Sequence, residues 1–128
     1  MSEQENRRTV EQLVRALNER DLELFDEQFH EDAVMEYPQS GERIVGGEKR
    51  RAAYGSFPGL PTVTPRRIMV SGDLAILEAR LDYGDSADWR VVMVFELRDG
   101  KITRETSYWS QPFEPAGWRA TWVALIDD

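Results

Sequence analysis

The feature that most constrains the fold is the alternation of side chains from Trp89 to Leu97. Positions 89, 91, 93, 95 and 97 are Trp, Val, Met, Phe and Leu, whereas the positions between them are Arg, Val, Val and Glu. Successive side chains of a strand point to opposite faces, so this pattern predicts a strand with one wholly apolar face. Asp99-Gly100 follows directly, and it is typical of a hairpin turn because glycine accepts a positive φ. The chain is therefore expected to contain an antiparallel sheet.

The same two-residue period continues through the second half of the chain. We predict strands over residues 62–70, 74–83, 89–98 and 101–110. The segments between them are Ser71-Gly72-Asp73, Gly84-Asp85-Ser86 and Asp99-Gly100, whose residue types are those that tight turns prefer. Strands joined by such short turns pair in antiparallel order, so this half is expected to form a meander.

The first part of the chain has the period of an α-helix instead. Four apolar residues recur at i, i+3, i+4 and i+7, namely Val10, Leu13, Val14 and Leu17. This stripe predicts a helix over residues 9–18 with one buried face. The side chain of Asp21 can accept a hydrogen bond from the free N–H groups that open a second, short helix. The buried face of that helix is expected to comprise Leu22, Phe25 and Phe29.

A short hairpin and a third helix are predicted before the meander. Residues 33–37 are expected to form a strand that Pro38 ends, and residues 43–45 a strand that returns after a polar turn. Gly46-Gly47 opens a helix that runs to about residue 57, where Pro58-Gly59 stops it. The inner face of this helix is expected to comprise Ala53, Tyr54 and Phe57.

A last helix is predicted over residues 115–126. Pro115 suits a first helical turn, because its φ is already helical and its missing N–H has no helical partner there. Trp118, Trp122 and Leu125 then fall on one side of the helix. So large an apolar surface on a terminal segment predicts a contact. We expect a homodimer that buries the outer face of the sheet, with this helix near the interface.

The composition limits the class of protein. A length of 128 residues suits one domain, expected to span residues 1–128 with a helical extension over about 112–128. A formal net charge of −8 opposes binding to nucleic acid or to an anionic membrane surface. No apolar run approaches the roughly 20 residues of a membrane span, and the polar N-terminus does not resemble a signal peptide. We therefore expect a cytoplasmic protein that has no nucleic-acid or membrane partner.

Cysteine is absent from the sequence, and His30 is the only histidine. The absence of cysteine excludes disulfides, thiol nucleophiles and cysteine-bound metals. A metal site would rest mainly on carboxylates, and no carboxylate cluster has the spacing of a ligand set. We expect neither a metal nor another cofactor.

Helices that precede an antiparallel meander imply an α+β fold, in which the helices pack on one face of a curved, mostly antiparallel sheet. The concavity of such a sheet is a place where small ligands bind. The chain also resembles a known family through these segments: Val14-Arg15-Ala16-Leu17-Asn18, Asp21-Leu22, Phe29, Asp32-Ala33-Val34, Pro38, residues 94–102 and Tyr108-Trp109. In this order they resemble the SnoaL-like proteins of the nuclear transport factor 2-like superfamily, whose fold is cone-shaped.

The resemblance implies small-molecule chemistry, because the family includes polyketide cyclases, limonene-type epoxide hydrolases, ketosteroid isomerases, dehydratases and non-catalytic binding domains. The positions of the three isomerase residues hold Leu13, Tyr37 and Met93, which argues against that reaction. Arg80-Leu81-Asp82 is similar to the Arg-x-Asp of the hydrolases, but Ser107 stands where their second aspartate lies. Each of these catalytic sets is incomplete in this chain.

Glu105 is the first acid–base candidate. The resemblance points the face that carries Glu105, Ser107 and Trp109 toward the cavity, where burial raises the pKa of a carboxyl group. Lys101 and Thr103 lie on the same alternation and indicate an outward face instead. A bulge near the preceding turn reverses the parity, so both orientations stay open.

Asp82 with Arg80, and His30, are the other acid–base candidates. If Asp82 and Arg80 face the pocket together with Glu78, the arginine can orient the carboxylate or stabilise an oxyanion. Their alternation with leucines also fits a solvated strand face. His30 has a side chain suited to proton transfer at neutral pH, but a histidine at a helix end often only meets free carbonyls.

Seven further residues are candidates for lining the pocket: Tyr37, Tyr54, Phe57, Trp89, Met93, Ser107 and Trp109. Aromatic residues at such spacings also simply pack in a core. We predict a protein that binds a small organic molecule and performs cofactor-free acid–base chemistry, such as cyclisation, isomerisation, dehydration or hydrolysis. A non-catalytic binding domain and a protein-interaction module with the same fold are the alternatives.

Overall fold

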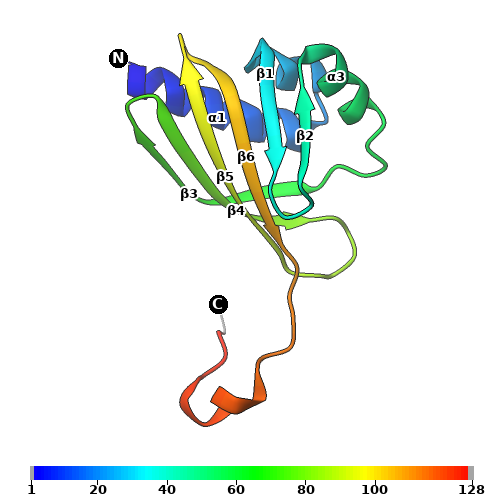
Figure 1. Cartoon of the computed structure of the whole chain (residues 1–128), viewed down its shortest axis with the longest axis vertical. Helices are drawn as coiled ribbons and strands as arrows, with labels where there is room; N and C mark the ends of the chain where they lie inside the picture. Colours follow the sequence, from blue (N-terminus) through cyan, green and yellow to red (C-terminus); the bar gives the residue numbers. More distant parts are fainter. Residues whose placement is uncertain (1, 127–128) are drawn as a thin grey trace.

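The predicted meander is joined by two further strands in one curved sheet. A computed structural model describes residues 2–126 and gives the strand order β2-β1-β6-β5-β4-β3 (Figure 1). The strands are β1 (Phe29–Tyr37), β2 (Glu42–Val45), β3 (Thr62–Ser71), β4 (Leu74–Asp82), β5 (Trp89–Arg98) and β6 (Lys101–Ser110). β1 runs parallel to β6, and the other neighbouring strands pair antiparallel. The four strands of the meander begin and end within one residue of the predicted positions.

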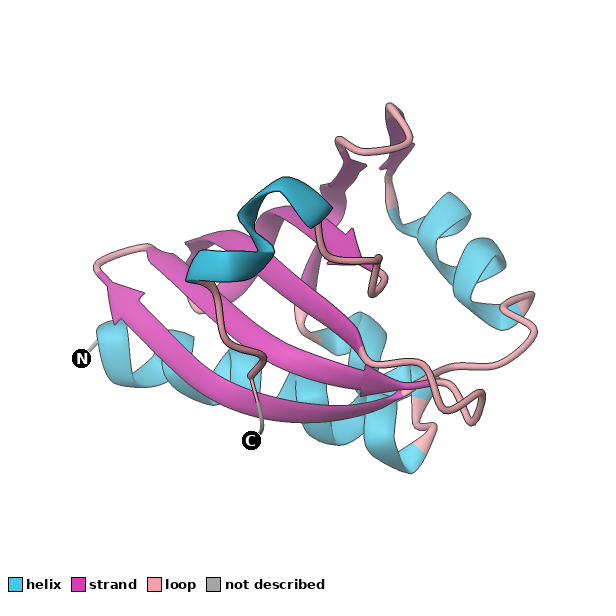
Figure 2. Cartoon of the chain, turned by 90° about the horizontal axis from the view of Figure 1, so that it is seen from below, coloured by secondary structure: helices cyan, strands magenta, loops and turns pink. Residues whose placement is uncertain are grey.

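Helix α1 (Ser2–Glu19) lies along one face of the sheet, as Figure 2 shows, and it contacts β3, β4 and β6. The predicted apolar stripe is buried, because it faces the sheet. The helix begins earlier than predicted, and the buried Asn6 ties its first turns to the β3–β4 turn by donating to the Gly72 carbonyl over 2.9 Å. The predicted α+β class, with helices on a curved and mostly antiparallel sheet, is confirmed. Among residues 2–126, no helix is long and apolar enough to cross a membrane.

The side chains of β5 alternate between the core and the outer face as predicted. Val91, Met93 and Phe95 are buried under the helices, whereas Val92 is 39% exposed on the opposite face. Burying a large apolar side chain stabilises a fold by about 1.5–3 kcal/mol, so this parity fixes which face of the sheet holds the core.

Two details of the short helices differ from the prediction. Helix α2 (Leu22–Glu27) is capped by Asp21 as expected, with Leu24 N–H donating to its carboxylate over 3.0 Å. It ends before Phe29, which was predicted on its buried face, because Gln28 folds back and donates to the Leu24 carbonyl over 2.9 Å. Phe29 opens β1 instead and is buried against Phe25.

Helix α3 (Gly47–Gly55) is shorter than predicted, and its inner face differs. Ala53 is exposed, so its predicted place in the core is wrong. The inward positions are Gly47, Arg50 and Tyr54, which are spaced by three and four residues as one helix face requires. Phe57 lies beyond the end of the helix and is partly buried.

A β-bulge in β6 decides the orientation that the sequence left open. Leu97 pairs with Ile102, and Glu96 pairs with Arg104, so Thr103 is an extra residue without a partner in the register. Ile102 points into the core before the bulge, and Glu105 and Ser107 point into it afterwards. An extra residue reverses the alternation of a strand, which is why Glu105 is buried although Lys101 is exposed.

The C-terminal segment is not the helix that was predicted over residues 115–126. It leaves the end of β6 and lies apart from the rest of the chain (Figure 1). Within residues 111–126 its only helix is the 3-10 helix Gly117–Trp122. Trp118 and Trp122 are 76% and 77% exposed. A helix of this length is stable only when its apolar side packs against another element. Because these side chains are exposed, residues 115–126 do not form the predicted α-helix. The predicted extension also included residues 127 and 128, which lie outside the described residues.

Candidate functional site

Glu105 is a buried carboxyl group in the centre of the sheet. Its relative exposure is 1%, and its strand neighbours in register are Met35 on β1 and Phe95 on β5. An ionisable side chain is rarely placed in such surroundings, because leaving water disfavours its charged form. This position therefore has a cost in stability that a purely structural residue would avoid.

The surroundings of Glu105 set its protonation. Burial raises the pKa of Glu105 from 4.5 to about 7, and the Ser107 hydrogen bond and the charge of Arg50 oppose part of that rise. The Ser107 hydroxyl donates to Oε2 of Glu105 over 2.9 Å. A carboxyl group with a pKa near 7 can both take up and release a proton at neutral pH.

Two tyrosines lie near enough to feel the charge of Glu105. Burial and, to a smaller extent, the charge of Glu105 raise the pKa of Tyr37 to about 12. The pKa of Tyr54 is raised well above its ordinary value by the same two causes. Both phenols therefore stay protonated at neutral pH and can act as hydrogen-bond donors.

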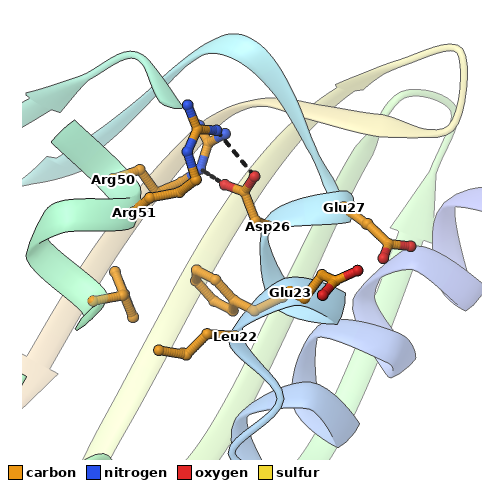
Figure 3. Close-up of a pocket in the computed structure, with 8 residues that line it drawn as sticks. Leu22, Glu23, Asp26, Glu27, Arg50 and Arg51 are labelled. Atoms are coloured by element: carbon orange, nitrogen blue, oxygen red, sulfur yellow. Dashed lines mark hydrogen bonds and ion pairs between the residues drawn. The ribbon is translucent and has the colours of Figure 1, made fainter. Parts of the chain in front are cut away.

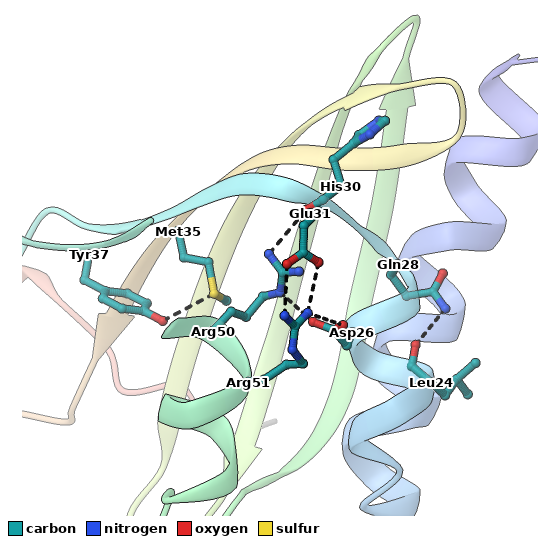
Figure 4. A network of polar contacts seen from close by, with 9 residues as sticks. All are labelled: Leu24, Asp26, Gln28, His30, Glu31, Met35, Tyr37, Arg50 and Arg51. Atoms are coloured by element: carbon teal, nitrogen blue, oxygen red, sulfur yellow. Dashed lines mark hydrogen bonds and ion pairs between the residues drawn. The ribbon is translucent and has the colours of Figure 1, made fainter. Parts of the chain in front are cut away.

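Arg50 is a buried charged residue whose charge acts on Glu105, and it is not among the residues predicted from the sequence. Its side chain is buried and donates from Nε to Asp26 over 2.8 Å (Figure 4). Its guanidinium carbon also lies over the ring of Phe29, 4.7 Å from the ring centroid. A second donor reaches the carbonyl of His30 over 3.3 Å, and Nη2 has no hydrogen-bond partner within the described structure. The spacing from Gly47 to Arg50 to Tyr54 was the available signal, but a charged residue is not usually assigned to a core face.

A small cavity lies at the end of the sheet where β6 finishes. Its lining residues are Leu17, Tyr54, Phe57, Leu60, Pro61, Val63, Leu81, Tyr83, Met93 and Trp109. Its volume of about 30 Å³ is enough for water but not for an organic substrate. Trp109 Nε1 is buried there without a partner in the part of the chain described. Glu105 lies on the same face of β6, two alternate positions deeper than Trp109, and does not line this cavity.

A larger groove of about 390 Å³ lies between α2 and α3. Leu22, Glu23, Phe25, Asp26, Glu27, Arg50, Arg51 and Tyr54 line it. Figure 3 shows Arg50 and Arg51 side by side at one end, facing Asp26. Tyr54 lines both this groove and the small cavity.

Three of the predicted acid–base residues lie away from Glu105. Asp82 and Arg80 are on the exposed face of β4, where Asp82 accepts from Gly84 N–H over 2.7 Å and Arg80 lies 3.8 Å from Asp88. Asp82 and Arg80 therefore lie on a solvated strand face, which was the alternative interpretation of their alternation with leucines. His30 is on β1 and not at a helix end, and its ring contacts the Arg98 carbonyl at 2.7 Å. In Figure 4 its side chain points away from Tyr37 and Met35.

The predicted lining residues fall into three groups. Tyr54, Phe57, Met93 and Trp109 line the small cavity. Tyr37 packs on Trp109 with ring centroids 5.0 Å apart, and Ser107 bonds to Glu105. Trp89 does not line the cavity but packs edge-on against Tyr83 at 5.4 Å. Within residues 2–126, no group of three or more His, Asp or Glu side chains has the arrangement of a metal site.

The narrowness of the cavity leads to a prediction for Met93→Trp. The added rings exceed the free volume of about 30 Å³, so overpacking should lower the free energy of unfolding by about 1–3 kcal/mol. Urea denaturation measures the change. Val92→Trp is the matched control, since this neighbouring side chain is on the exposed face. A Met93→Trp variant as stable as the wild type would mean that the cavity opens more readily than its volume indicates.

The comparison with protein families identifies the chain. The profile of the SnoaL-like domain matches residues 10–105, so the chain belongs to this family, and the resemblance found in the sequence is confirmed. The comparison with curated proteins gave no match.

Solved structures share the fold along the chain. A Kribbella flavida protein assigned as a candidate ketosteroid isomerase is 27% identical, with 100% of this chain and 94% of that one covered at a TM-score of 0.90. A nuclear transport factor 2-like protein of unknown function from Burkholderia xenovorans is 36% identical over 99% of each chain, at a TM-score of 0.85. An epoxide hydrolase from M. tuberculosis is 27% identical over 86% of each chain, at a TM-score of 0.74. Their assignments differ, so the likeness defines the fold and not the reaction.

Proposed function

We propose that this protein is a cofactor-free acid–base enzyme for a small, largely apolar organic molecule that carries a carbonyl group. The observation that carries the proposal is Glu105, a buried carboxyl group whose pKa is raised to about 7. Enzymes tune a glutamate to this range when it must move protons at neutral pH.

The surrounding donors support proton abstraction next to a carbonyl. The Glu105 carboxylate takes a proton from the carbon beside the carbonyl. The C–H electron pair then forms a C=C bond to the carbonyl carbon, and the π pair of the carbonyl moves onto its oxygen to give an enolate. Buried O–H and N–H groups stabilise such an oxyanion. Tyr54 and the unpartnered Trp109 Nε1 are suitable donors, because both line the cavity next to this site. Protonated Glu105 then returns its proton to carbon, which completes an isomerisation or an exchange.

Substrate entry requires a change at Tyr54. This side chain lines both the small cavity and the groove of about 390 Å³. Displacing the Tyr54 ring joins the two spaces and gives a ligand a path toward Glu105. Phe25 and Phe57 stack on Tyr54 and provide apolar surface along this path.

Glu105→Gln tests the proposal. With a panel of small ketones in D₂O, the wild type should accelerate exchange of the proton beside the carbonyl, which ¹H NMR follows. Glutamine cannot accept the proton, so the variant should lose about 10²-fold or more in rate. In the wild type the rate should rise with pH and level off above about 7, because the base form of Glu105 is the active one.

Glu96→Gln is the matched control, because its carboxylate is exposed on the neighbouring strand β5. Equal exchange rates in Glu105→Gln and the wild type would exclude Glu105 as the base. The second candidate function is non-catalytic binding in the groove of about 390 Å³, whose lining does not include Glu105. Ligand binding without any accelerated exchange would support that function.

A further inference from the structure

The sheet is uneven at the end where the small cavity lies, because β6 continues past the end of β1. Within residues 2–126, the last register pair between these strands is Glu36 with Thr106, whereas β6 runs on to Ser110. The backbone of this last stretch of β6 therefore has no β1 residue opposite it to accept its hydrogen bonds. Trp109, which lines the cavity, lies in this stretch.

A side chain takes the place of the missing strand. Gln39 Oε1 accepts a hydrogen bond from the backbone N–H of Trp109 over 2.5 Å, although the two residues are 70 positions apart in the sequence. Gln39 belongs to the turn that joins β1 to β2. This single bond therefore ties that turn to the end of β6.

The turn that carries Gln39 is itself closely held. The Tyr37 carbonyl accepts from the N–H groups of Ser40 and Gly41 over 3.2 and 2.9 Å, and from the Ser40 hydroxyl over 3.3 Å. Gly41 has a φ of +77°, which glycine adopts without steric cost. The backbone beside Gln39 is thus fixed by local bonds, which limits the positions that its amide group can reach.

Trp109 is held on two sides as a result. Its ring packs on Tyr37 with centroids 5.0 Å apart, and its backbone is held by Gln39. Its Nε1 is buried and has no hydrogen-bond partner among the described residues. A donor stabilises a developing oxyanion only if it is in place before the reaction. The contacts that fix Trp109 therefore decide whether its N–H can serve in this way.

We propose that Gln39 is a positioning residue, which holds Trp109 so that its indole N–H faces the substrate oxygen. This role rests on the proposed function, in which Trp109 Nε1 is a donor to the oxyanion. The placement of the indole can be measured without a substrate, so the positioning role and the proposed function can fail separately.

Nuclear magnetic resonance tests the placement of Trp109. Gln39→Met keeps most of the side-chain length but removes the acceptor, whereas Gln39→Glu keeps an acceptor at the same reach. In Gln39→Met the backbone amide of Trp109 should exchange with D₂O about tenfold faster than in the wild type, as the loss of one ordinary hydrogen bond implies. The indole N–H resonance of Trp109 should shift as well. Gln39→Glu should match the wild type in both.

Unchanged amide exchange and an unchanged indole resonance in Gln39→Met would overturn the positioning role, whether or not the protein is active. Ser40→Ala is the control for the turn. It removes one bond to the Tyr37 carbonyl, leaves the two backbone bonds and Gln39 in place, and should behave as the wild type does.

Proton exchange on a ketone that the wild type accepts tests the consequence for catalysis. Gln39→Met should lower kcat about tenfold or more with little change in KM, because a misplaced donor no longer meets the oxyanion. Gln39→Glu should restore kcat. The pH at which the rate levels off should stay near 7 in each variant, because Glu105 is unchanged. A moved midpoint would instead indicate a general change of the core and would overturn a specific effect on Trp109.

A Trp109→Phe background separates positioning from other effects of the substitution. This background lacks the indole N–H, so Gln39→Met should cause no further loss of kcat in it. A further tenfold loss there, or a wild-type kcat in Gln39→Met alone, contradicts the positioning role. A wild type that accelerates no exchange would overturn the proposed function instead, and the resonance measurements would still decide whether Gln39 positions Trp109.

Discussion

Glu105→Gln is expected to stabilise the fold by about 3 kcal/mol at pH 8 and to have almost no effect at pH 4.5 or below. Burial raises the pKa of Glu105 from 4.5 to about 7. The folded state therefore holds the proton more tightly than the unfolded state does. The contribution of the neutral carboxyl group is fully present below pH 4.5, falls as the pH rises, and is lost above about pH 7. Glutamine is neutral at every pH and does not suffer this loss.

Urea denaturation at several pH values measures the difference between the two proteins. The difference isolates Glu105, because all other titrating groups are common to both. Glu96→Gln, an exposed position on β5, serves as the control and should not reproduce the trend. A difference that does not vary between pH 4.5 and pH 8 would show that Glu105 is not strained by ionisation in the fold. Together, the denaturation and proton-exchange experiments show whether Glu105, which lowers the stability of the fold when ionised, is also the residue that transfers the proton.

Glu105 also shows how far the sequence could predict the site. The meander was predicted closely, because each strand carries a strong alternation and is bounded by turn residues. The orientation of Glu105 depends on one residue without a register partner, Thr103, the third residue of β6. The sequence allowed a bulge near the turn, but neither its position nor its existence follows from residue types, since bulges are set by pairing with neighbouring strands.

Arg50 and Phe29 show the same limit for tertiary contacts. A buried arginine is stable only because Asp26 on α2 and the His30 carbonyl on β1 accept from it, and both partners are distant in sequence. Phe29 left its predicted helix because Gln28 ends α2 by a local side-chain bond that propensity does not encode. Burial at both positions is a consequence of packing between elements, which periodicity along a single element cannot show.

The C-terminal segment was predicted wrongly as a helix for a related reason. Trp118, Trp122 and Leu125 have the spacing of an apolar helix face. The prediction of a helix assumes that another element of the same chain packs against this face. In the described structure these three side chains are exposed, and the segment contains a 3-10 helix over Gly117–Trp122. An apolar pattern indicates that a segment needs a contact, but not with which molecule it is made.

Arg50→Met is expected to lower the free energy of unfolding by about 3 kcal/mol, because removing one partner of a buried ion pair leaves the other poorly solvated. Methionine fills much of the space that the Arg50 side chain occupies beside the Phe29 ring. The loss of stability therefore reflects the missing polar contacts more than a cavity. The second consequence concerns Glu105. The charge of Arg50 lowers the pKa of Glu105, so the variant should raise that pKa above about 7.

Arg51→Met is the matched control, since Arg51 is the adjacent residue of α3 and also bonds to Asp26 but is 48% exposed. Water can replace its contacts, so its removal should cost much less stability than the removal of Arg50, as is usual for exposed pairs. Carbon-13 NMR titration of the glutamate side chains gives the Glu105 pKa in each variant, and urea denaturation gives the stability. If Arg50→Met destabilised the fold but left the Glu105 titration unchanged, Arg50 would be a structural residue of α3 only. A parallel change in both measurements would establish that Asp26, Arg50 and Glu105 act as one connected set, in which α2 and α3 adjust the proton affinity of a carboxyl group on β6.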